Sequence, residues 1–350
     1  MKKPIGLILV FLFCWSCGTS GKKKEVTSTQ ELSPFWQPFA TGTKNSLRGL
    51  SAVSSDVAWA SGSGGMVIRT TDGGATWEKV SVPDADTLDF RDIEAFDAQR
   101  ALVLSAGLPA TIYLTTDGGQ SWQQTYFSDV EGTFYDAMDF WNEQEGIAFG
   151  DAMDGRLLIL KTKDGGTSWQ PLPFEQRPVA LPGQGGFAAS GTCLRTVGEQ
   201  QVYIGLGGDE ASLFYSFDQG ETWQKTLTPL QSGEPTAGIF SIDFQTEQEG
   251  LMVGGDYRGD SLTNINAAYT TDGGRSWFPL RAEHKPKGYR SGLAILKDGL
   301  VLAVGRESSD YRLPGAQKFL PMEGQYYAVS ATNDGQTAWA SGSQGRVAKL

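Results

Sequence analysis

Short apolar runs separated by glycine-rich turns recur along the chain after residue 46. The first series runs through Leu47–Leu50, Ala58–Gly62 and Met66–Arg69, and each run is only four or five residues long. Runs of this length, bounded by turn residues, favour β-strands over helices. Comparable series begin at Phe90, Phe134, Ala189, Ile239 and Tyr289. We therefore expect a sheet protein assembled from repeated units.

One pattern, [Ser/Thr]-x-Asp-x-Gly-x-[Ser/Thr]-Trp, ends five of these series. The tryptophans are 45, 47, 54 and 54 residues apart, close to the length of a four-stranded propeller blade. An aspartate in a glycine-rich turn can accept backbone N–H groups, and the tryptophan supplies a large apolar surface. We assign a structural role, and no calcium site, to these residues: Asp72, Trp77, Asp117, Trp122, Asp164, Trp169, Asp218, Trp223, Asp272 and Trp277.

These sequences resemble the Asp boxes of bacterial neuraminidase repeat propellers. A sixth unit keeps only Phe319 at the tryptophan position, and a seventh, Tyr326–Leu350, repeats the first but stops after three strands. Asn333–Thr337 imitates a box, but its alignment places it in the first hairpin turn of that unit. We predict that Trp36–Phe39 supplies the missing outer strand. The fold class is therefore all-β: a single seven-bladed β-propeller of four-stranded blades over residues 34–350, closed by its N-terminal strand.

The first 17 residues are typical of a bacterial export signal. Lys2 and Lys3 precede the apolar run Ile5–Phe13, whose nine residues are too few to span a bilayer. The following Cys14-Trp15-Ser16-Cys17-Gly18 resembles a lipoprotein signal, in which a small residue precedes the lipidated cysteine. This resemblance implies lipidation at Cys17, a flexible tether over residues 18–33, and sorting to the outer membrane of a Gram-negative bacterium.

Composition narrows the classes of function. Glycine makes up 45 of the 350 residues, which suits many turns and few long helices. The net charge of −11 argues against nucleic acid as a partner. His284 is the single histidine, which excludes a metal centre with two imidazole ligands. We expect no metal, no cofactor, a monomer, and no disulfide within the domain, because Cys193 is the one cysteine outside the export segment.

Propeller geometry separates two faces of the ring. The Asp boxes and the turns between first and second strands lie on one face, the box face. The inner strands begin at the opposite face, the funnel face, where the turns between second and third strands also lie. Loops on a rigid scaffold commonly carry binding sites. Charged and aromatic residues recur at the funnel face, which predicts a ligand site there, although these may equally be read as ordinary solvated turns. The predicted site residues are Arg48, Arg91, Asp92, Tyr135, Asp136, Asp151, Asp209, Asp256, Tyr257, Arg290 and Tyr327.

Two catalytic alternatives stay open. Sialidases also carry Asp boxes and hold a substrate carboxylate with three arginines, and Arg48, Arg91 and Arg290 resemble such a clamp. In that case Tyr135 or Tyr327 is the candidate nucleophile, and Asp92 or Asp136 the candidate acid. A second resemblance, to seven-bladed Asp-box glucanases, points to Asp136 and Asp256 as paired carboxylates. However, sialidase propellers have six blades, and those glucanases use two propellers where this chain has one.

Over residues 36–350 the blade pattern resembles the photosystem II stability/assembly factor family, whose members are single seven-bladed Asp-box propellers. That family binds partner proteins during membrane-complex assembly and is not catalytic. The resemblance implies a lipid-anchored cell-envelope protein that binds a protein or glycan ligand at its funnel face, with no catalytic residues. A glycoside hydrolase acting on envelope or environmental glycans is the competing hypothesis.

Overall fold

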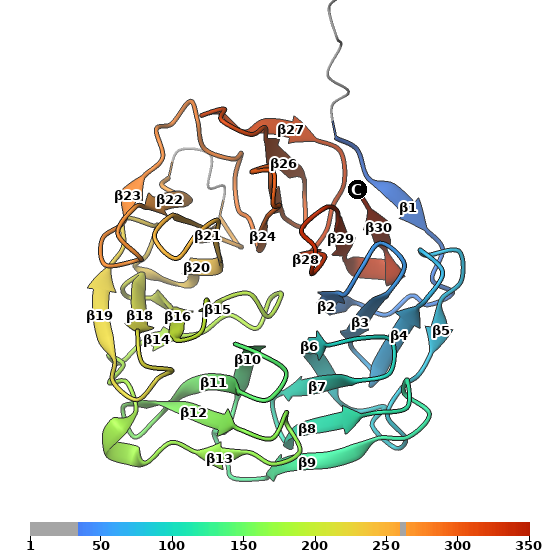
Figure 1. Cartoon of the computed structure of the whole chain (residues 1–350). Helices are drawn as coiled ribbons and strands as arrows, with labels where there is room; N and C mark the ends of the chain where they lie inside the picture. The colour runs from blue at the N-terminus through green and yellow to red at the C-terminus, as the bar shows by residue number, and fades with distance from the viewer. Residues whose placement is uncertain (1–33, 260–263) are drawn as a thin grey trace, which may run out of the picture. The chain divides into compact units, whose positions relative to one another are not determined.

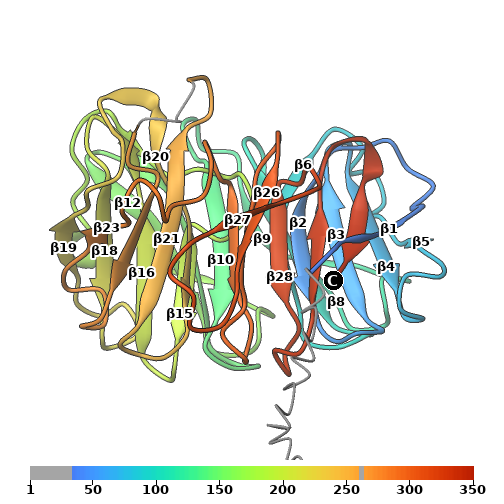
Figure 2. The ribbon, with the colours of Figure 1, turned by 90° about the horizontal axis from the view of Figure 1, so that it is seen from above.

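The predicted propeller is confirmed. The computed structural model describes residues 34–259 and 264–350, and over these ranges the strands form seven sheets around a central channel (Figure 1). The strands run between two faces that carry the connecting loops (Figure 2). The helical elements described are the short 3-10 turns η1 (Phe174–Gln176) and η2 (Ser343–Gly345). No helix among the described residues is long and apolar enough to cross a membrane.

Each blade is an antiparallel sheet whose first strand lies nearest the channel. Blade 1 contains β2 (Leu47–Ala52), β3 (Ala58–Gly62), β4 (Met66–Thr70) and β5 (Glu78–Lys79). Blade 2 contains β6 (Asp89–Ala95), β7 (Ala101–Ala106), β8 (Ala110–Thr115) and β9 (Gln123–Ser128). Blade 3 contains β10 (Tyr135–Phe140), β11 (Gly146–Met153), β12 (Arg156–Thr162) and β13 (Gln170–Pro171).

Blade 4 contains β15 (Leu194–Val197), β16 (Gln201–Gly205), β18 (Ser212–Ser216) and β19 (Gln224–Leu227). Blade 5 contains β20 (Glu234–Phe244), β21 (Gly250–Asp256), β22 (Ala267–Thr270) and β23 (Phe278–Pro279), and the short strands β14 (Gln184–Gly185) and β17 (Gly207–Gly208) extend its inner edge. Blade 6 contains β24 (Gly292–Ile295), β25 (Val301–Val304), β26 (Ser309–Arg312) and β27 (Leu320–Met322).

The N-terminal strand closes the ring, as predicted. Blade 7 contains β28 (Ala328–Ala331), β29 (Ala338–Ser341) and β30 (Val347–Lys349), and β1 (Gln37–Phe39) pairs with β30 as its outer strand. The preceding Trp36 is buried and packs edge-on against Tyr326, with the ring centroids 5.4 Å apart. Closure occupies an edge that would otherwise present unpaired backbone groups.

The Asp boxes lie between the third and fourth strands, where the sequence places them. In the first box the Thr76 N–H donates to Asp72 Oδ1 at 2.9 Å, and the Thr76 hydroxyl donates to Asp72 Oδ2 at 2.6 Å. The Thr70 hydroxyl donates to Asp72 Oδ1 and its oxygen accepts the Gly74 N–H. The same pattern recurs at the other four boxes. The imitation around Asp334 lies in the first hairpin turn of blade 7, also as predicted.

The box tryptophans fill the interfaces between blades. The buried apolar side chains form a cluster between each pair of neighbouring blades, and each box tryptophan packs against the blade that precedes its own. Phe319 takes the equivalent place in the cluster between blades 5 and 6. The ring is therefore held by aromatic contacts that repeat once per blade.

The structure corrects the start of one inner strand and does not describe the N-terminal residues. The inner strand expected from Ala189 begins instead at Leu194, so the alignment of that unit was wrong at its start. The predicted export signal (residues 1–17), the lipidated Cys17 and the tether (residues 18–33) lie outside the described residues and stay predictions.

Candidate functional site

A segment preceding blade 4 closes the channel near the funnel face. Residues 186–192, here named the plug, follow β14 and extend toward the centre of the ring before β15 begins (Figure 1). Ala188, Ala189 and Ser190 are buried within it. The Ser190 hydroxyl donates to the Ser291 carbonyl at 2.6 Å, and the Ile242 N–H donates to the Thr192 carbonyl at 2.9 Å. The plug is thus bonded to blade 5, the neighbour of its own blade, and to blade 6 beyond it.

Glycines let the plug approach the inner strands. Gly191 has φ of 77°, a conformation that L side chains rarely adopt, and a Cβ there would collide with the Asp92 carboxylate. A Cβ at Gly186 would lie 2.6 Å from Asp136 Cγ. Gly186 and Gly191 are therefore required for the close approach of the plug to the inner strands.

Several predicted site residues hold the plug. Arg48 and Arg91 donate to the carbonyls of Ala189 and Ala188, each at 3.4 Å, and Asp151 Oδ1 accepts the Gly186 N–H at 2.9 Å. Burial, and then the neighbouring Arg91, lower the pKa of Arg48. The Arg48 guanidinium also lies 4.3 Å from the ring centre of Tyr327. The structure brings Arg48, Arg91 and Asp151 together, and their common contact is a segment of the chain itself.

Asp92 and Asp136 are buried beneath the plug. Asp92 accepts the N–H groups of Ile93 at 2.9 Å and Met138 at 2.7 Å, and burial raises its pKa to about 7 against these hydrogen bonds. Asp136 has no exposed surface, and neither of its oxygens has a hydrogen-bond partner among the described residues.

The remaining predicted residues are dispersed. Tyr135 is buried and its hydroxyl lies 3.2 Å from that of Tyr126. Arg290 is 1% exposed and donates to Asp310, Ser308 and the Tyr289 carbonyl. Asp256, Tyr257 and Arg290 line a cavity of about 600 Å³ beside blade 6, whereas Asp209 is an exposed turn residue.

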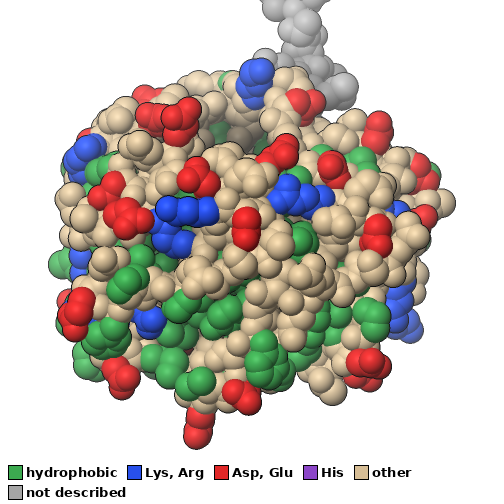
Figure 3. Space-filling view, turned by 60° about the horizontal axis from the view of Figure 1, so that its bottom comes forward, with side chains coloured by type: hydrophobic (Ala, Val, Ile, Leu, Met, Phe, Trp, Pro, Cys, Tyr) green, Lys and Arg blue, Asp and Glu red, His purple; other side chains and the backbone are tan. Residues whose placement is uncertain are grey.

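A larger cavity occupies the channel on the box-face side of the plug. Its volume is about 810 Å³, and Ser190, Gly191 and Thr192 of the plug form part of its wall. The rest of the lining comes from the last residues of the inner strands and the turns that follow them. On the face shown in Figure 3, acidic side chains are scattered and do not gather into one patch.

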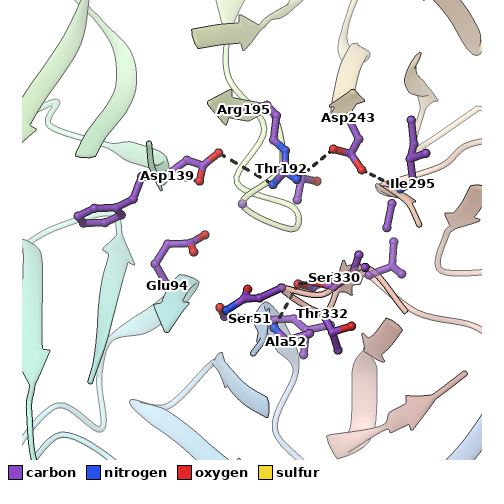
Figure 4. A pocket seen from close by; sticks show the side chains of 18 of the residues that line it. Ser51, Ala52, Glu94, Asp139, Thr192, Arg195, Asp243, Ile295, Ser330 and Thr332 are labelled. Carbon is purple, nitrogen blue, oxygen red and sulfur yellow. Dashed lines mark hydrogen bonds and ion pairs between the residues drawn. The ribbon is translucent and has the colours of Figure 1, made fainter. Parts of the chain in front are cut away.

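Charged side chains from neighbouring inner strands line this cavity, among them Glu94, Asp139, Arg195 and Asp243. Arg195 lies between two carboxylates, 3.0 Å from Asp243 and 4.0 Å from Asp139, and Glu94 points toward the open centre (Figure 4). Asp243 is the main cause of the raised pKa of Arg195. Burial, and then Asp139 and Asp92, raise the pKa of Glu94 well above its usual range.

Most of these carboxylates have a structural task. Asp139 Oδ2 accepts the Thr196 N–H of blade 4, and Asp243 Oδ2 accepts the Ile295 N–H of blade 6, both at 2.7 Å. Each carboxylate therefore joins its inner strand to the next blade, as Asp92 does through Met138. Ser51 and Ser330 do the same with hydroxyl oxygens, which accept the N–H groups of Ala95 and Ala52.

Glu94 departs from this pattern. It sits at the same register as Asp139 and Asp243, paired with Leu102 as they pair with Ile147 and Leu251. No described residue donates a hydrogen bond to it, and Asp92 already makes the bond to blade 3. The carboxyl of Glu94 is therefore not needed for joining the blades and is available to a ligand.

Sequence reasoning missed Glu94, Asp139, Arg195 and Asp243. A signal was present, because Asp139-Phe140 recurs as Asp243-Phe244 at the end of two inner strands. The prediction considered only where inner strands begin, and the open cavity lies where they end.

Family comparison gives two matches. The model of photosynthesis system II assembly factor YCF48 matches residues 27–131, and the BNR/Asp-box repeat matches residues 214–225. The chain is a seven-bladed Asp-box propeller, and its first third is similar to the YCF48 family. No curated protein matches it.

Solved structures support this fold. A YCF48-like propeller described as YCF48 bound to D1 peptide is 18% identical with a TM-score of 0.66, covering 91% of this chain and 97% of that one. YCF48 from Cyanidioschyzon merolae is 16% identical with a TM-score of 0.64, covering 91% and 99%. A GH74 xyloglucanase from Xanthomonas campestris is 14% identical with a TM-score of 0.63, covering 89% of this chain but only 53% of that enzyme. At these identities the structures share the fold.

Proposed function

We propose that this YCF48-like propeller is a lipid-anchored protein of the cell envelope that binds a segment of a partner protein, as an assembly factor. Anchoring at Cys17 would hold the rigid ring at a membrane, where two or more acyl chains suffice for stable attachment. The matched family is one of assembly factors, and one solved YCF48 is bound to a peptide. Both support a protein ligand over a glycan.

The box-face cavity is the observation that carries this proposal. It is large enough for several side chains of an inserted segment, since ligand pockets commonly measure roughly 300–1,000 Å³. The plug forms its floor, so an inserted segment would enter from the box face. The site we propose thus differs from the funnel-face site expected from sequence, where Arg48, Arg91 and Asp151 are already engaged with the plug.

The acidic residues of the cavity indicate the charge that the bound segment would carry. Asp92, Glu94, Asp139 and Asp243 line the cavity, and Arg195 is held between two of them. A Lys, an Arg or a free amino terminus would favour the ionised form of Glu94, which otherwise lacks a partner. The proposed ligand is therefore a partner segment with at least one cationic group.

Affinity purification from native membranes tests the proposal. The tagged full chain is crosslinked mildly and purified beside Glu94→Arg, which reverses charge in the cavity, and Arg91→Ala at the funnel face. Glu307→Arg is the matched control, because its side chain is 80% exposed away from the cavity. Thermal unfolding of each variant checks that the fold is retained.

We expect one stoichiometric partner to co-purify with the wild type, Arg91→Ala and Glu307→Arg. The amount of this partner recovered with Glu94→Arg should be at least tenfold lower. If the partner is lost with Arg91→Ala alone, the binding site lies at the funnel face and the cavity proposal is overturned. No partner with any form would overturn protein binding itself, and a glycan-binding and hydrolysis screen would then test the hydrolase alternative.

A further inference from the structure

Asp136 is a buried carboxyl on which a negative charge would be poorly compensated. It lies on β10, facing the plug at Gly186 and the Phe149 ring, and it is 0% exposed. Neither oxygen accepts a hydrogen bond from any described residue. Other buried inner-strand aspartates, such as Asp92 and Asp243, accept two or more hydrogen bonds. A buried ionised carboxylate without such bonds is strongly unfavourable, so Asp136 is neutral while the plug is seated.

The groups that face Asp136 come from three sides. Asp151 lies on the neighbouring β11, Arg91 lies on β6 of blade 2, and the buried Cys193, which also interacts with Asp92, follows the plug. Burial raises the pKa of Asp136 well above its usual range, and Asp151 adds to this effect. Arg91 and the Ala188 amide act in the opposite direction without cancelling it. Arg91 is itself engaged, since its Nε donates to Asp89 at 2.8 Å.

We propose that the plug is a proton-linked gate, seated over a neutral Asp136 and released when that carboxyl ionises, which opens the channel from one face to the other. The plug separates the box-face cavity from the funnel face, so its release joins the two. Because Asp136 lies under Gly186, lifting the plug exposes the carboxyl to water and removes the cause of its raised pKa. This gate rests on Asp136 and the plug alone and does not depend on what the cavity binds.

The direction of the pH effect follows from linkage. The pKa of Asp136 is higher with the plug seated than with it released, so seating takes up a proton. Seating is therefore strongest below the released-state pKa of about 4 and weakens as pH rises above it, until the seated-state pKa is reached. One linked proton lowers the closing equilibrium constant about tenfold for each pH unit in that window.

Amide hydrogen exchange of the peptide spanning residues 184–193 measures this equilibrium in the full chain. Rates are corrected for the intrinsic pH dependence of exchange and followed from pH 5 to pH 8. Alkylation of Cys193 at fixed pH 7, read on its own peptide, is a second measure, because this thiol is buried and donates to the Phe187 carbonyl of the plug.

Four variants make the test specific. Asp136→Asn keeps the shape without the titration and should hold the plug at all pH values. Asp151→Asn removes a nearby negative charge and should lower the pKa of Asp136 in the seated state, so the loss of protection should level off at a lower pH than in the wild type. Gly191→Ala, which collides with Asp92, shows what an unseated plug looks like. Asp209→Asn, an exposed carboxyl, is the matched control.

We expect the exchange protection of residues 184–193 to fall about tenfold per pH unit in the wild type and in Asp209→Asn. In Asp136→Asn the protection should not change with pH, and Cys193 should be alkylated at least tenfold more slowly than in the wild type. A slope that survives in Asp136→Asn would assign the proton to another group, such as Asp92, and overturn the proposal. A flat profile in the wild type would overturn it as well.

Discussion

At the scale of single residues, carboxylates do three different things in this protein. In the boxes, exposed aspartates are stabilised as anions by hydrogen bonds from residues within four positions of themselves. In the inner strands, buried aspartates such as Asp92 and Asp243 accept N–H groups of the next blade. Glu94 and Asp136 do neither, and they are the two on which our proposals rest. The partners of a carboxylate, more than its burial, therefore separate structural from functional candidates.

The first residue-scale prediction concerns Asp117. The hydroxyl and N–H of Ser121 hold its pKa low, at about 2. Since this value lies below the usual one, the stabilisation is present above about pH 4 and is lost as pH falls toward 2. Asp117→Asn should lower the urea midpoint at pH 7, because the amide NH₂ cannot accept from the Ser121 hydroxyl. The gap from wild type should narrow between pH 5 and pH 3; an unchanged gap would contradict this account.

At the scale of elements, each blade places an aromatic residue, at the box tryptophan position or its equivalent, in the interface with the preceding blade. Trp169 is 5% exposed and packs against Phe140, with ring centroids 5.8 Å apart, in the cluster between blades 2 and 3. Phe319 shows that the smaller ring also fills such a slot. The loss of a box tryptophan from blade 6 is therefore compatible with a closed ring.

Trp169→Ala should lower the free energy of unfolding by about 3–5 kcal/mol, the usual cost of removing a buried aromatic side chain. Trp169→Phe should cost less than half of this, because the indole N–H has no acceptor among the described residues and its removal also deletes an unpaired donor. Urea denaturation of both variants measures the difference. If both variants lose the same free energy of unfolding, the indole makes contacts that phenylalanine cannot replace.

At the scale of the whole molecule, the ring depends on its first and last strands meeting. β1 pairs with β30 through Gln37, Pro38 and Phe39, and this pairing joins residues more than 300 positions apart. Without β1, the backbone of Val347–Lys349 becomes an open edge of the kind that recruits other strands. Closure thus governs both the stability and the association state of the propeller.

A chain beginning at residue 41 should melt at a lower temperature than one beginning at residue 34, and it should associate as its concentration rises. The comparison requires thermal unfolding and light scattering after size-exclusion chromatography at two concentrations. A truncated chain that stays monomeric with an unchanged melting temperature would show that β1 is dispensable for closure.

The sequence by itself determined the blades and their number, because these features depend on local interactions, and it predicted closure because the seventh unit is one strand short. Each box is a set of hydrogen bonds within a few residues, as between Thr70, Asp72 and Thr76, so the pattern is visible wherever it recurs. The same holds for the strand lengths, and Phe319 could be assigned to its slot by spacing alone.

Only the tertiary structure decided which face of the channel is open. The contact between Arg48 and Ala189 spans 141 positions, and that between Ser190 and Ser291 spans 101. No periodic pattern marks such pairs, because the plug is an irregular segment whose position depends on what the assembled ring leaves room for. Glu94 likewise looks like its neighbours in sequence, and only the arrangement of seven inner strands around one axis shows that it alone of its register lacks a structural partner among the described residues.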